Sequence, residues 1–460
     1  MGESSPPPAG RRRTRLVSSL VLGQRACEVA LDPERGALEW TEQPQPRGGR
    51  ESYAVPISEI IAVEETEIDK KQSNSGKWQK MAKPHAFTVT ERANHARDNL
   101  LEVNLEKYDG VVCVGGDGMF NEVMHGLIGR TQKDSGIDQN NPKAPLVQCN
   151  IRIGIIPAGS TDCICYSTVG INDPVTSALH IIVGDTQPLD VSSVHHHNTL
   201  LKYFVSLLGY GFYGDILKDS EGKRWMGPVR YDLSGFKTFL SHHYYEGTIS
   251  LLPASHAVGS PRDKKHCRSG CRVCKQSKQQ LEIDQKKNGG EIKGDDEGEW
   301  KVIRGKFLAI NTANISCACP RSPKGLSPAA HLADGSADLI LVRKCSRFNF
   351  LRYLIRHTNR DDQFDFSFVE VYRIKKFLFT SKHLEDGDFN AEKMQKNRFG
   401  HFCRDHPACC CIPPSSTWNC DGETLDCSTI EVMVHCQLMK LFARGVEKNS
   451  PLEEIQRQRC

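Results

Sequence analysis

Three short stretches of this sequence combine glycines with acidic or hydroxyl side chains in patterns that suit binding of a nucleotide or of a metal ion. They are Gly115-Gly-Asp-Gly118, Pro157-Ala-Gly-Ser-Thr161 and Asp421-Gly-Glu423. Glycine lets the backbone come close to a ligand, and free N–H groups at the start of a helix attract phosphate. Together the three stretches indicate a site for a nucleotide or for a transferred phosphoryl group.

Asp117 is the residue that phosphate binding alone does not explain. Its carboxylate repels phosphate, so it gains a role in such a turn only by holding a metal ion or by accepting a proton. The alternative is a tight turn between a strand and a helix in which Asp117 acts as a cap. Taken alone, the Gly115–Gly118 turn leaves both interpretations open.

The elements around these turns are predicted from hydrophobic periodicity. A strand over Val111–Val114 precedes a helix from about Met119, and a strand over Ile151–Ile156 precedes helices over 163–168 and 174–183. The same strand, glycine turn and helix therefore occur twice. This repetition predicts an α/β layer with a parallel sheet, in which both turns meet beyond the carboxyl ends of the strands.

Several of the remaining candidates also have a structural interpretation, which the sequence favours for the hydroxyls and for Asp421 when each is taken alone. Ser160 and Thr161 stand at a helix start, where a hydroxyl either caps the helix or binds phosphate. Arg224 and Arg230 could clamp phosphates in forked geometry, or lie on a solvated basic helix. Asp421-Gly422 is also a common hairpin turn. These residues gain weight as ligands only in combination with the glycine turns.

Cys267, Cys271 and Cys274 have the spacing of metal ligands but lack an obvious fourth ligand. His266 or the cysteines between 403 and 411 could supply one, and reversible oxidation or acylation is an open alternative. The chain has 19 cysteines in 460 residues. A chain of this length without a convincing secretory signal favours a reduced, cytosolic protein over a disulfide-rich secreted one.

The composition narrows the class of protein. A net charge of +4 gives no support for nucleic-acid binding, and no apolar run approaches the roughly 18 residues of a membrane span. The basic, amphipathic segment Arg347–His357 fits a helix that binds calmodulin or an anionic lipid surface, or a domain helix with a basic solvent face.

The change in predicted secondary structure along the chain indicates its domains. Residues 1–90 contain short strands of a partial β module, 91–188 an α/β domain that opens with a helix over 91–106, and 189–445 a mainly antiparallel β domain. Insertions interrupt the β domain at 255–299 and 382–414, and residues 446–460 form a tail.

Val114–Gly118 with Glu122, Ile156–Thr161 and Asp421–Glu423 resemble motifs of the diacylglycerol and sphingosine kinase family of lipid kinases. Further stretches resemble its ceramide kinase branch, namely 192–196, 209–215, 237–243, 267–274 and 347–357. Residues 56–66 and 76–80 look like the first half of the pleckstrin-homology domain that such kinases carry.

The resemblance implies ATP-dependent phosphorylation of the primary hydroxyl of ceramide. Asp117 would be the general base, and Gly115, Gly116 and Gly118 would hold the substrate beside it. The residues implied around ATP and its Mg²⁺ are Glu122, Ser160, Thr161, Arg224, Arg230, Asp421, Gly422 and Glu423. The resemblance also implies Ca²⁺ stimulation, through calmodulin at 347–360, and a cytoplasmic enzyme bound peripherally to ceramide-containing, anionic Golgi and plasma membranes.

The chain departs from the family pattern at one place. The family has a nucleotide loop of the type Asn-Pro-x-x-Gly-Gly on the first strand of the kinase domain, and none occurs between Trp78 and Val111. The second half of the pleckstrin-homology domain is absent as well. This pattern resembles an internal deletion, which would leave one edge of the kinase sheet open. The alternative function is therefore an inactive isoform that binds lipid or calmodulin.

Overall fold

The structure is a computed structural model that describes residues 88–287, 298–357, 362–382 and 415–446, together with the backbone of five strands before them. An antiparallel sheet of order β1-β2-β3-β4 forms the N-terminal module, as expected. Its strands are β1 (Leu16–Leu22), β2 (Arg25–Asp32), β3 (Ala37–Glu42) and β4 (Ser52–Pro56). A separate strand, β5 (Ile60–Ala62), pairs with β6 (Thr88–Val89).

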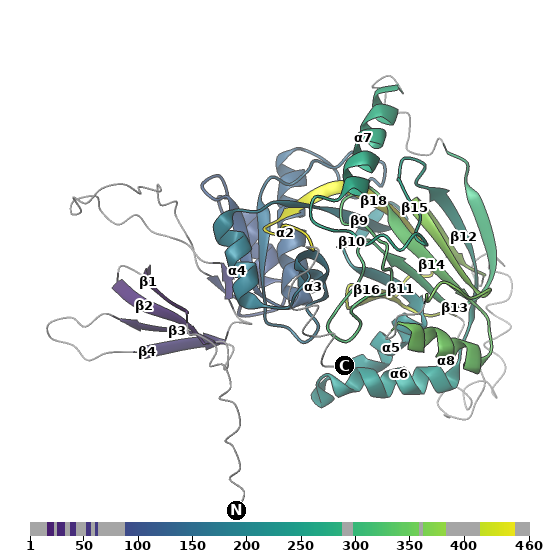
Figure 1. The fold of residues 1–460 in the computed structure, drawn as a ribbon, viewed down its shortest axis with the longest axis horizontal. Coiled ribbons are helices and arrows are strands. Elements are labelled where there is room, and N and C mark those ends of the chain that lie inside the picture. Colours follow the sequence, from purple (N-terminus) through teal and green to yellow (C-terminus); the bar gives the residue numbers. More distant parts are fainter. Residues whose placement is uncertain are drawn as a thin grey trace, which may run out of the picture.

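The two expected strand–turn–helix units are parallel neighbours, and their helices lie together in Figure 1. Strand β7 (Gly110–Gly115) leads into helix α2 (Asp117–Asp134). Strand β8 (Arg152–Pro157) leads to helices α3 (Cys163–Val169) and α4 (Pro174–Val183). Gly115 pairs with Pro157 at the ends of their strands, so both turns leave the sheet at the same edge. Helix α2 begins two residues before the predicted Met119, which makes Asp117 its first residue.

The apolar face of α2 forms the centre of the α/β core. Phe120, Val123, Met124 and Leu127 are all buried there, which confirms the helical periodicity read from the sequence. Helix α1 (His95–Glu102) packs against α2. It is shorter than the predicted helix over 91–106, because Asn94 before it has a left-handed backbone conformation and Val103 after it is extended.

The second half of the chain is mainly antiparallel, as predicted. Its strands are β9 (Gln187–His196), β10 (Thr199–Phe204), β11 (Leu207–Gly211), β12 (Tyr245–Pro253), β13 (Lys301–Ala313), β14 (Ala337–Arg343), β15 (Val369–Ser381), β16 (Trp418–Cys420), β17 (Glu423–Leu425) and β18 (Thr429–Leu441). Near its end β18 also pairs in parallel with β8, at Lys440 with Arg152 and Leu441 with Ile153. The sheets of the two predicted domains are therefore continuous.

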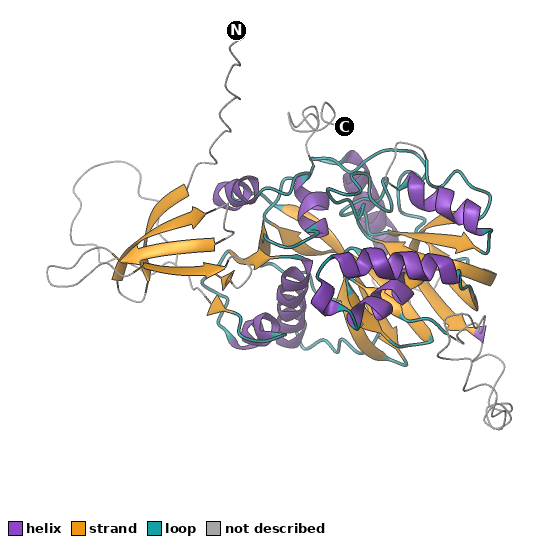
Figure 2. Cartoon of the chain, turned by 90° about the horizontal axis from the view of Figure 1, so that it is seen from below, coloured by secondary structure: helices purple, strands orange, loops and turns teal. Residues whose placement is uncertain are grey.

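Helices cover this large sheet (Figures 1 and 2). Helices α5 (Phe212–Glu221), α6 (Val229–Ser241) and α8 (Arg347–Arg356) gather together in Figure 1, with the short 3₁₀ helix η2 (Arg224–Met226) before α6. Helix α7 (Arg272–Lys287) lies within the insertion at 255–299, for which the sequence analysis predicted no helix. Residues 383–414 of the other insertion lie outside the described residues.

One edge of the α/β layer carries no ladder partner among the described strands. Strand β7 hydrogen-bonds to β8 alone, and β5 lies beside it without pairing to it. This agrees with the open edge expected from a missing first strand. In the part of the chain that the structure describes, no helix has the length and apolar character needed to cross a membrane.

Candidate active site

The two glycine turns touch each other through their backbones. A Cβ on Gly159 would lie 2.6 Å from the Cα of Gly116 and 2.5 Å from Oδ1 of Asp162. The N–H of Ala158 donates to the carbonyl of Gly115 at 3.1 Å. Only glycine allows so close an approach. The predicted meeting of the two turns is thereby confirmed.

Asp117 lies where the turns meet and binds the neighbouring helix. Its Oδ2 accepts the N–H of Cys163 at 3.0 Å, and its Oδ1 accepts the N–H of Ile164 at 2.9 Å. These are the first N–H groups of α3, which a helix leaves without internal partners. The carboxylate therefore caps α3 rather than its own helix, whose N-cap Gly116 makes no side-chain bond. The alternative that Asp117 acts as a helix cap is therefore confirmed, but the helix that it caps is α3 and not α2.

The surroundings of Asp117 raise its proton affinity. Burial raises the pKa of Asp117 to about 6, and the negative charges of Asp162 and Asp421 act in the same direction. The two N–H bonds from α3 oppose this effect. A carboxylate with a pKa near 6 is largely ionised at neutral pH and is still basic enough to take a proton from a hydroxyl group in the transition state. General-base chemistry is therefore open to Asp117.

Asp162 is a residue of the site that the sequence analysis missed. It is buried, has a left-handed backbone at the start of α3, and accepts the N–H of Gly159 at 2.9 Å through Oδ1. Its Oδ2 accepts a bond from Asn172 at 3.0 Å. Asp162 therefore shapes the second turn. An Asp directly before an apolar helical run is a recognised sign of a helix N-terminus, and it was available in the sequence.

Ser160 and Thr161 are exposed on the second turn. The capping role that the sequence allowed for them is wrong, because the N-cap position belongs to Asp162 and the first N–H groups of α3 bind Asp117. Neither hydroxyl donates or accepts a hydrogen bond to any residue in the described ranges. Both are therefore available to a ligand that approaches the turn.

Asp421 and Gly422 form the hairpin turn between β16 and β17, with φ values of 47° and 88°. Positive φ at both positions is typical of a type I′ turn. The carboxylate of Asp421 is buried and accepts the N–H groups of Val205, Ser206 and Leu207. It thus holds the connection between β10 and β11, while its carbonyl accepts a bond from Asn121 of α2. The hairpin joins the β-rich half to α2.

Two glutamates from the predicted site make structural contacts. Glu122 accepts the N–H groups of Asn94 at 2.9 Å and Ala96 at 3.3 Å, and so caps α1. Glu423 forms an ion pair with Lys202. Carboxylates at helix N-termini are stabilising because they meet the positive end of the helix dipole. Both side chains therefore already have protein partners.

Arg224 and Arg230 lie on η2 and α6, beyond the strand-to-helix bend at Gly211. Arg224 pairs with Glu221, and Arg230 donates to the hydroxyl of Tyr231 at 2.7 Å. No contact within the described ranges joins either guanidinium to the glycine turns. The structure therefore does not bring these arginines together with Asp117.

Cys267, Cys271 and Cys274 lie together, and the fourth member of their cluster is His331. The sequence analysis missed His331, since about 60 residues separate it from the cysteines and no spacing rule connects them. His266 is not part of the cluster. The cysteines between 403 and 411 lie outside the described residues.

Helices α6 and α8 expose neighbouring apolar stripes, here called the α6–α8 face. On α6 the stripe comprises Val229, Leu233, Phe236 and Leu240, and on α8 it comprises Phe348, Leu351 and Ile355. The two helices are joined by a bond from Arg347 to the carbonyl of Leu240. The opposite side of α8 is buried through Phe350 and Tyr353. An exposed apolar surface of this kind marks a binding surface for a protein or a membrane.

Comparison with known proteins places the chain in a family. Residues 204–456 match the ceramide kinase C-terminal domain, 16–114 the ceramide kinase PH domain, and 69–194 the diacylglycerol kinase catalytic domain. A solved structure titled as a putative diacylglycerol kinase from Bacillus anthracis str. Sterne aligns with 77% of this chain and 84% of its own, with 14% identity and a TM-score of 0.45.

Two mammalian relatives are similar to this chain over nearly their whole length. The chain is 55% identical to a ceramide kinase of Homo sapiens, over 94% of this chain and 97% of the relative, and 53% identical to one of Mus musculus, over 95% and 98%. The human alignment runs over 521 residues, more than the 460 of this chain, so the relative has segments without a counterpart here. With its C-terminal domain matched over more than half of the chain, this protein belongs to the ceramide kinase family.

Proposed function

We propose that this chain transfers the γ-phosphate of ATP to the primary hydroxyl of ceramide. The observation that carries the proposal is the position of Asp117, a mostly buried carboxylate with a pKa of about 6 at the contact of two glycine turns. Phosphoryl transfer asks little of the protein beyond positioning, charge stabilisation and a group that receives the hydroxyl proton. Membership of the ceramide kinase family is the argument for ceramide as the phosphoryl acceptor.

Asp117 accepts the proton of the ceramide hydroxyl. Each of its oxygens is fixed by one N–H of α3, and a carboxylate oxygen has a further lone pair for a substrate. Gly115, Gly116 and Gly118 hold the head group beside it. A Cβ at Gly118 would meet nothing within 4 Å, which leaves space for an acceptor next to Asp117.

The second turn receives the phosphates of ATP. Ser160 and Thr161 are exposed there and carry hydroxyls without protein partners in the described ranges. These hydroxyls fit Mg²⁺ that arrives with ATP, because Mg²⁺ in kinases is held largely by phosphates and water with few protein ligands. When bound, the ion neutralises charge that develops on the transferred group. Asp421 fits less well, since three backbone N–H groups already bind its carboxylate.

The remaining ligands act only after exchanging partners. Arg224 would have to leave Glu221, Arg230 would have to leave Tyr231, and Glu423 would have to leave Lys202. Nucleotide binding provides a reason for such an exchange, because phosphate oxygens pair strongly with guanidinium groups. Gly422 would keep the hairpin close to α2, and Glu122 would keep α1 in place.

The α6–α8 face brings the enzyme to the membrane that holds ceramide. Its apolar stripes are flanked by the exposed basic residues Lys237, Arg347 and Arg352, which suits anionic lipid head groups. Peripheral binding at Golgi and plasma membranes follows from the family resemblance. Calmodulin is the competing partner for 347–360. We favour lipid because one face of α8 is buried through Phe350 and Tyr353, whereas calmodulin surrounds its target helix.

The test is a transfer assay on the purified full chain. The chain is incubated with Mg²⁺ and γ-labelled ATP over ceramide, diacylglycerol or sphingosine in mixed micelles, and the labelled lipid is identified. We expect labelled ceramide phosphate, with ceramide preferred over the other two lipids. Absence of transfer, together with no saturable ATP binding, would instead support the inactive, lipid- or calmodulin-binding isoform, for which the missing nucleotide loop is the argument.

A further inference from the structure

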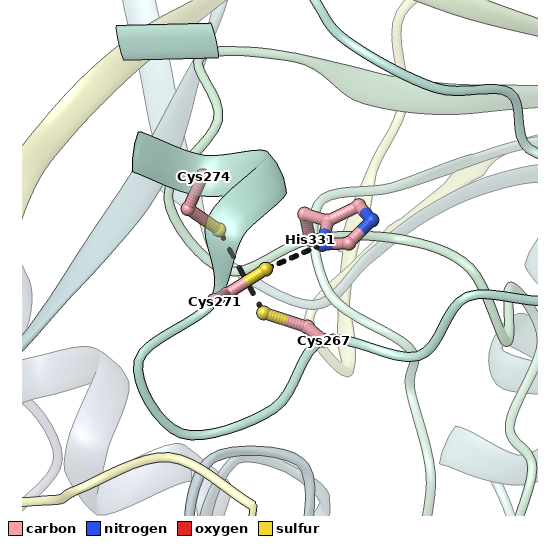
Figure 3. A group of neighbouring side chains, drawn as sticks. All are labelled: Cys267, Cys271, Cys274 and His331. Carbon is pink, nitrogen blue, oxygen red and sulfur yellow. Dashed lines mark hydrogen bonds between the residues drawn. The ribbon is translucent and has the colours of Figure 1, made fainter. Parts of the chain in front are cut away.

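Three cysteines and one histidine from two distant segments meet at one point (Figure 3). Cys267 lies in the loop before α7, Cys271 directly precedes that helix, and Cys274 lies in its first turn. His331 comes from the segment before β14 and turns its Nδ1 toward Cys271. The four ligand atoms all lie within 4.8 Å of one another. No other group of this kind occurs in the described ranges.

The distances between these atoms match the edges of a zinc tetrahedron. With Zn–S bonds of about 2.3 Å and Zn–N bonds of about 2.05 Å, tetrahedral geometry places two sulfurs about 3.8 Å apart and a sulfur and a nitrogen about 3.6 Å apart. The Sγ atoms of Cys267 and Cys274 are 3.7 Å apart. The Sγ of Cys271 and Nδ1 of His331 are 3.4 Å apart. Two of the six edges therefore have the lengths of a zinc tetrahedron, and the other pairs of ligand atoms lie within 4.8 Å of one another.

The groups around the cluster favour thiolate ligands. The N–H of Leu332 points to Sγ of Cys267 at 3.5 Å, a type of contact that orients and stabilises a metal-bound sulfur. Cys271 and Cys274 lie at the N-terminus of α7, where the helix dipole favours negative charge. His331 is 2% exposed, and its Nε2 has no partner among the described residues. Coordination through Nδ1 would fix the proton on Nε2.

We propose that Cys267, Cys271, Cys274 and His331 bind one structural Zn²⁺ ion. The set is of the Cys₃His type, with four protein ligands and no open position, so the ion has no part in the chemistry. Binding replaces the protons of the three thiols, which are released to solvent, and leaves the imidazole neutral. The competing state is a disulfide between Cys267 and Cys274, which would leave Cys271 and His331 without a function for their contact.

The zinc site supports the helix that positions Asp117. Between the cysteines, the N–H of Ser269 donates to the carbonyl of Val446 at 2.8 Å. Val446 in turn packs against Gly170, where a Cβ would lie 2.9 Å from its Cγ1. Gly170 ends α3, whose first N–H groups bind Asp117. Loss of zinc would loosen this chain of contacts. The effect on phosphoryl transfer rests on the proposed function, but the zinc content does not.

The experiment measures metal in the full chain, purified without a polyhistidine tag or chelator. Zinc per chain is determined by elemental mass spectrometry for the wild type, Cys271→Ser and His331→Gln. The matched controls are Cys319→Ser and His266→Gln, which replace the same residue types outside the cluster. We expect the first two variants to contain one zinc less per chain than the wild type and both controls to keep it. The test relies on the difference in zinc content between the wild type and the variants, because other cysteines could bind zinc independently.

A second measurement keeps the test decisive if the cluster variants do not fold. The wild-type chain is loaded with Co²⁺, and tetrahedral thiolate coordination gives intense visible absorption that Zn²⁺ displaces. The proposal would be overturned if the wild-type protein were isolated without zinc and did not give this spectrum with Co²⁺. Retention of zinc by both cluster variants would overturn it as well. Protection of Cys267 and Cys274 from alkylation, reversed by a reductant rather than by a chelator, would establish the disulfide instead.

Discussion

Replacement of Asp117 by Asn separates its proposed catalytic role from its structural one. Asn keeps the size of the side chain and one carbonyl oxygen, so one of the two N–H bonds from α3 remains. The other N–H then faces an amide NH₂ group. An unsatisfied buried N–H costs about 1–3 kcal/mol. The substitution also removes a buried negative charge next to those of Asp162 and Asp421.

The raised pKa of Asp117 gives the size of this second effect. A folded-state pKa of about 6, against about 3.9 in an unfolded chain, corresponds to about 3 kcal/mol. Because the folded value is the higher one, this stability is fully present below pH 4 and is lost as the pH rises through 6. Asn does not ionise and does not incur this loss. At pH 7 the stability gained by removing the ionised carboxylate and the stability lost with one N–H bond nearly cancel. The free energy of unfolding should therefore change by less than about 2 kcal/mol.

The effect on activity should be much larger. General-base catalysis contributes typically about 10²–10⁴-fold, so ceramide phosphorylation by Asp117→Asn should fall at least about 100-fold. The assay compares kcat and urea unfolding with those of Asp173→Asn. Asp173 also caps a helix, through a bond from the N–H of Thr176, but lies outside the turns. Asn is an equally good cap there. Near-normal kcat for Asp117→Asn, or an activity loss explained by unfolding, would refute the reasoning.

Three further predictions test the packing and the membrane face. Gly159→Ala should separate the two turns, because its Cβ would lie 2.6 Å from the Cα of Gly116. We expect kcat to fall and the free energy of unfolding, measured in urea, to decrease by about 1–3 kcal/mol. An unchanged kcat would contradict a role of this contact in activity. Arg373→Met should lower the free energy of unfolding by about 3–5 kcal/mol, because it leaves the buried carboxylate of Asp338, now bound at 3.1 Å, without its cationic partner; a loss under about 1 kcal/mol would count against this reasoning. Phe236, on α6, has a side chain that is 63% exposed. Phe236→Glu should weaken sedimentation of the protein with phosphatidylserine vesicles without changing its stability, whereas Val302→Glu should leave sedimentation unchanged. Equal binding by both variants would exclude the α6–α8 face as the membrane surface.

Local pattern was sufficient to predict the elements of the site. The β-branched run before Gly115 and the apolar spacing after Asp117 predict β7 and α2, because burial of a strand and of one helix face leaves a periodic signal. The repeat of this device at Gly159 predicts that the turns meet. What the pattern could not supply is the partner of Asp117. A hydrogen bond to Cys163 depends on the register of two parallel strands, which nothing in the local sequence specifies.

Long-range contacts explain the other differences from expectation. His331 joins the cysteine cluster from about 60 residues away, and no spacing rule in the sequence connects it to Cys274. The continuity of the two sheets rests on a short pairing of β18 with β8, too brief to leave a compositional signal. Helix α7 lies in the insertion at 255–299 and buries only Cys274 and Ser277 among its described side chains, so it does not require a strong hydrophobic face.

The central claim is that ionised Asp117 receives the proton of the ceramide hydroxyl, and the pH dependence of kcat/KM for ceramide tests it most directly. ATP and Mg²⁺ are kept saturating at each pH. Because the base must be ionised to act, kcat/KM should rise tenfold per pH unit below about 6 and reach a plateau above it. The rise should be absent from the residual activity of Asp117→Asn. A wild-type profile that is flat or falling between pH 5 and 7 would contradict the account.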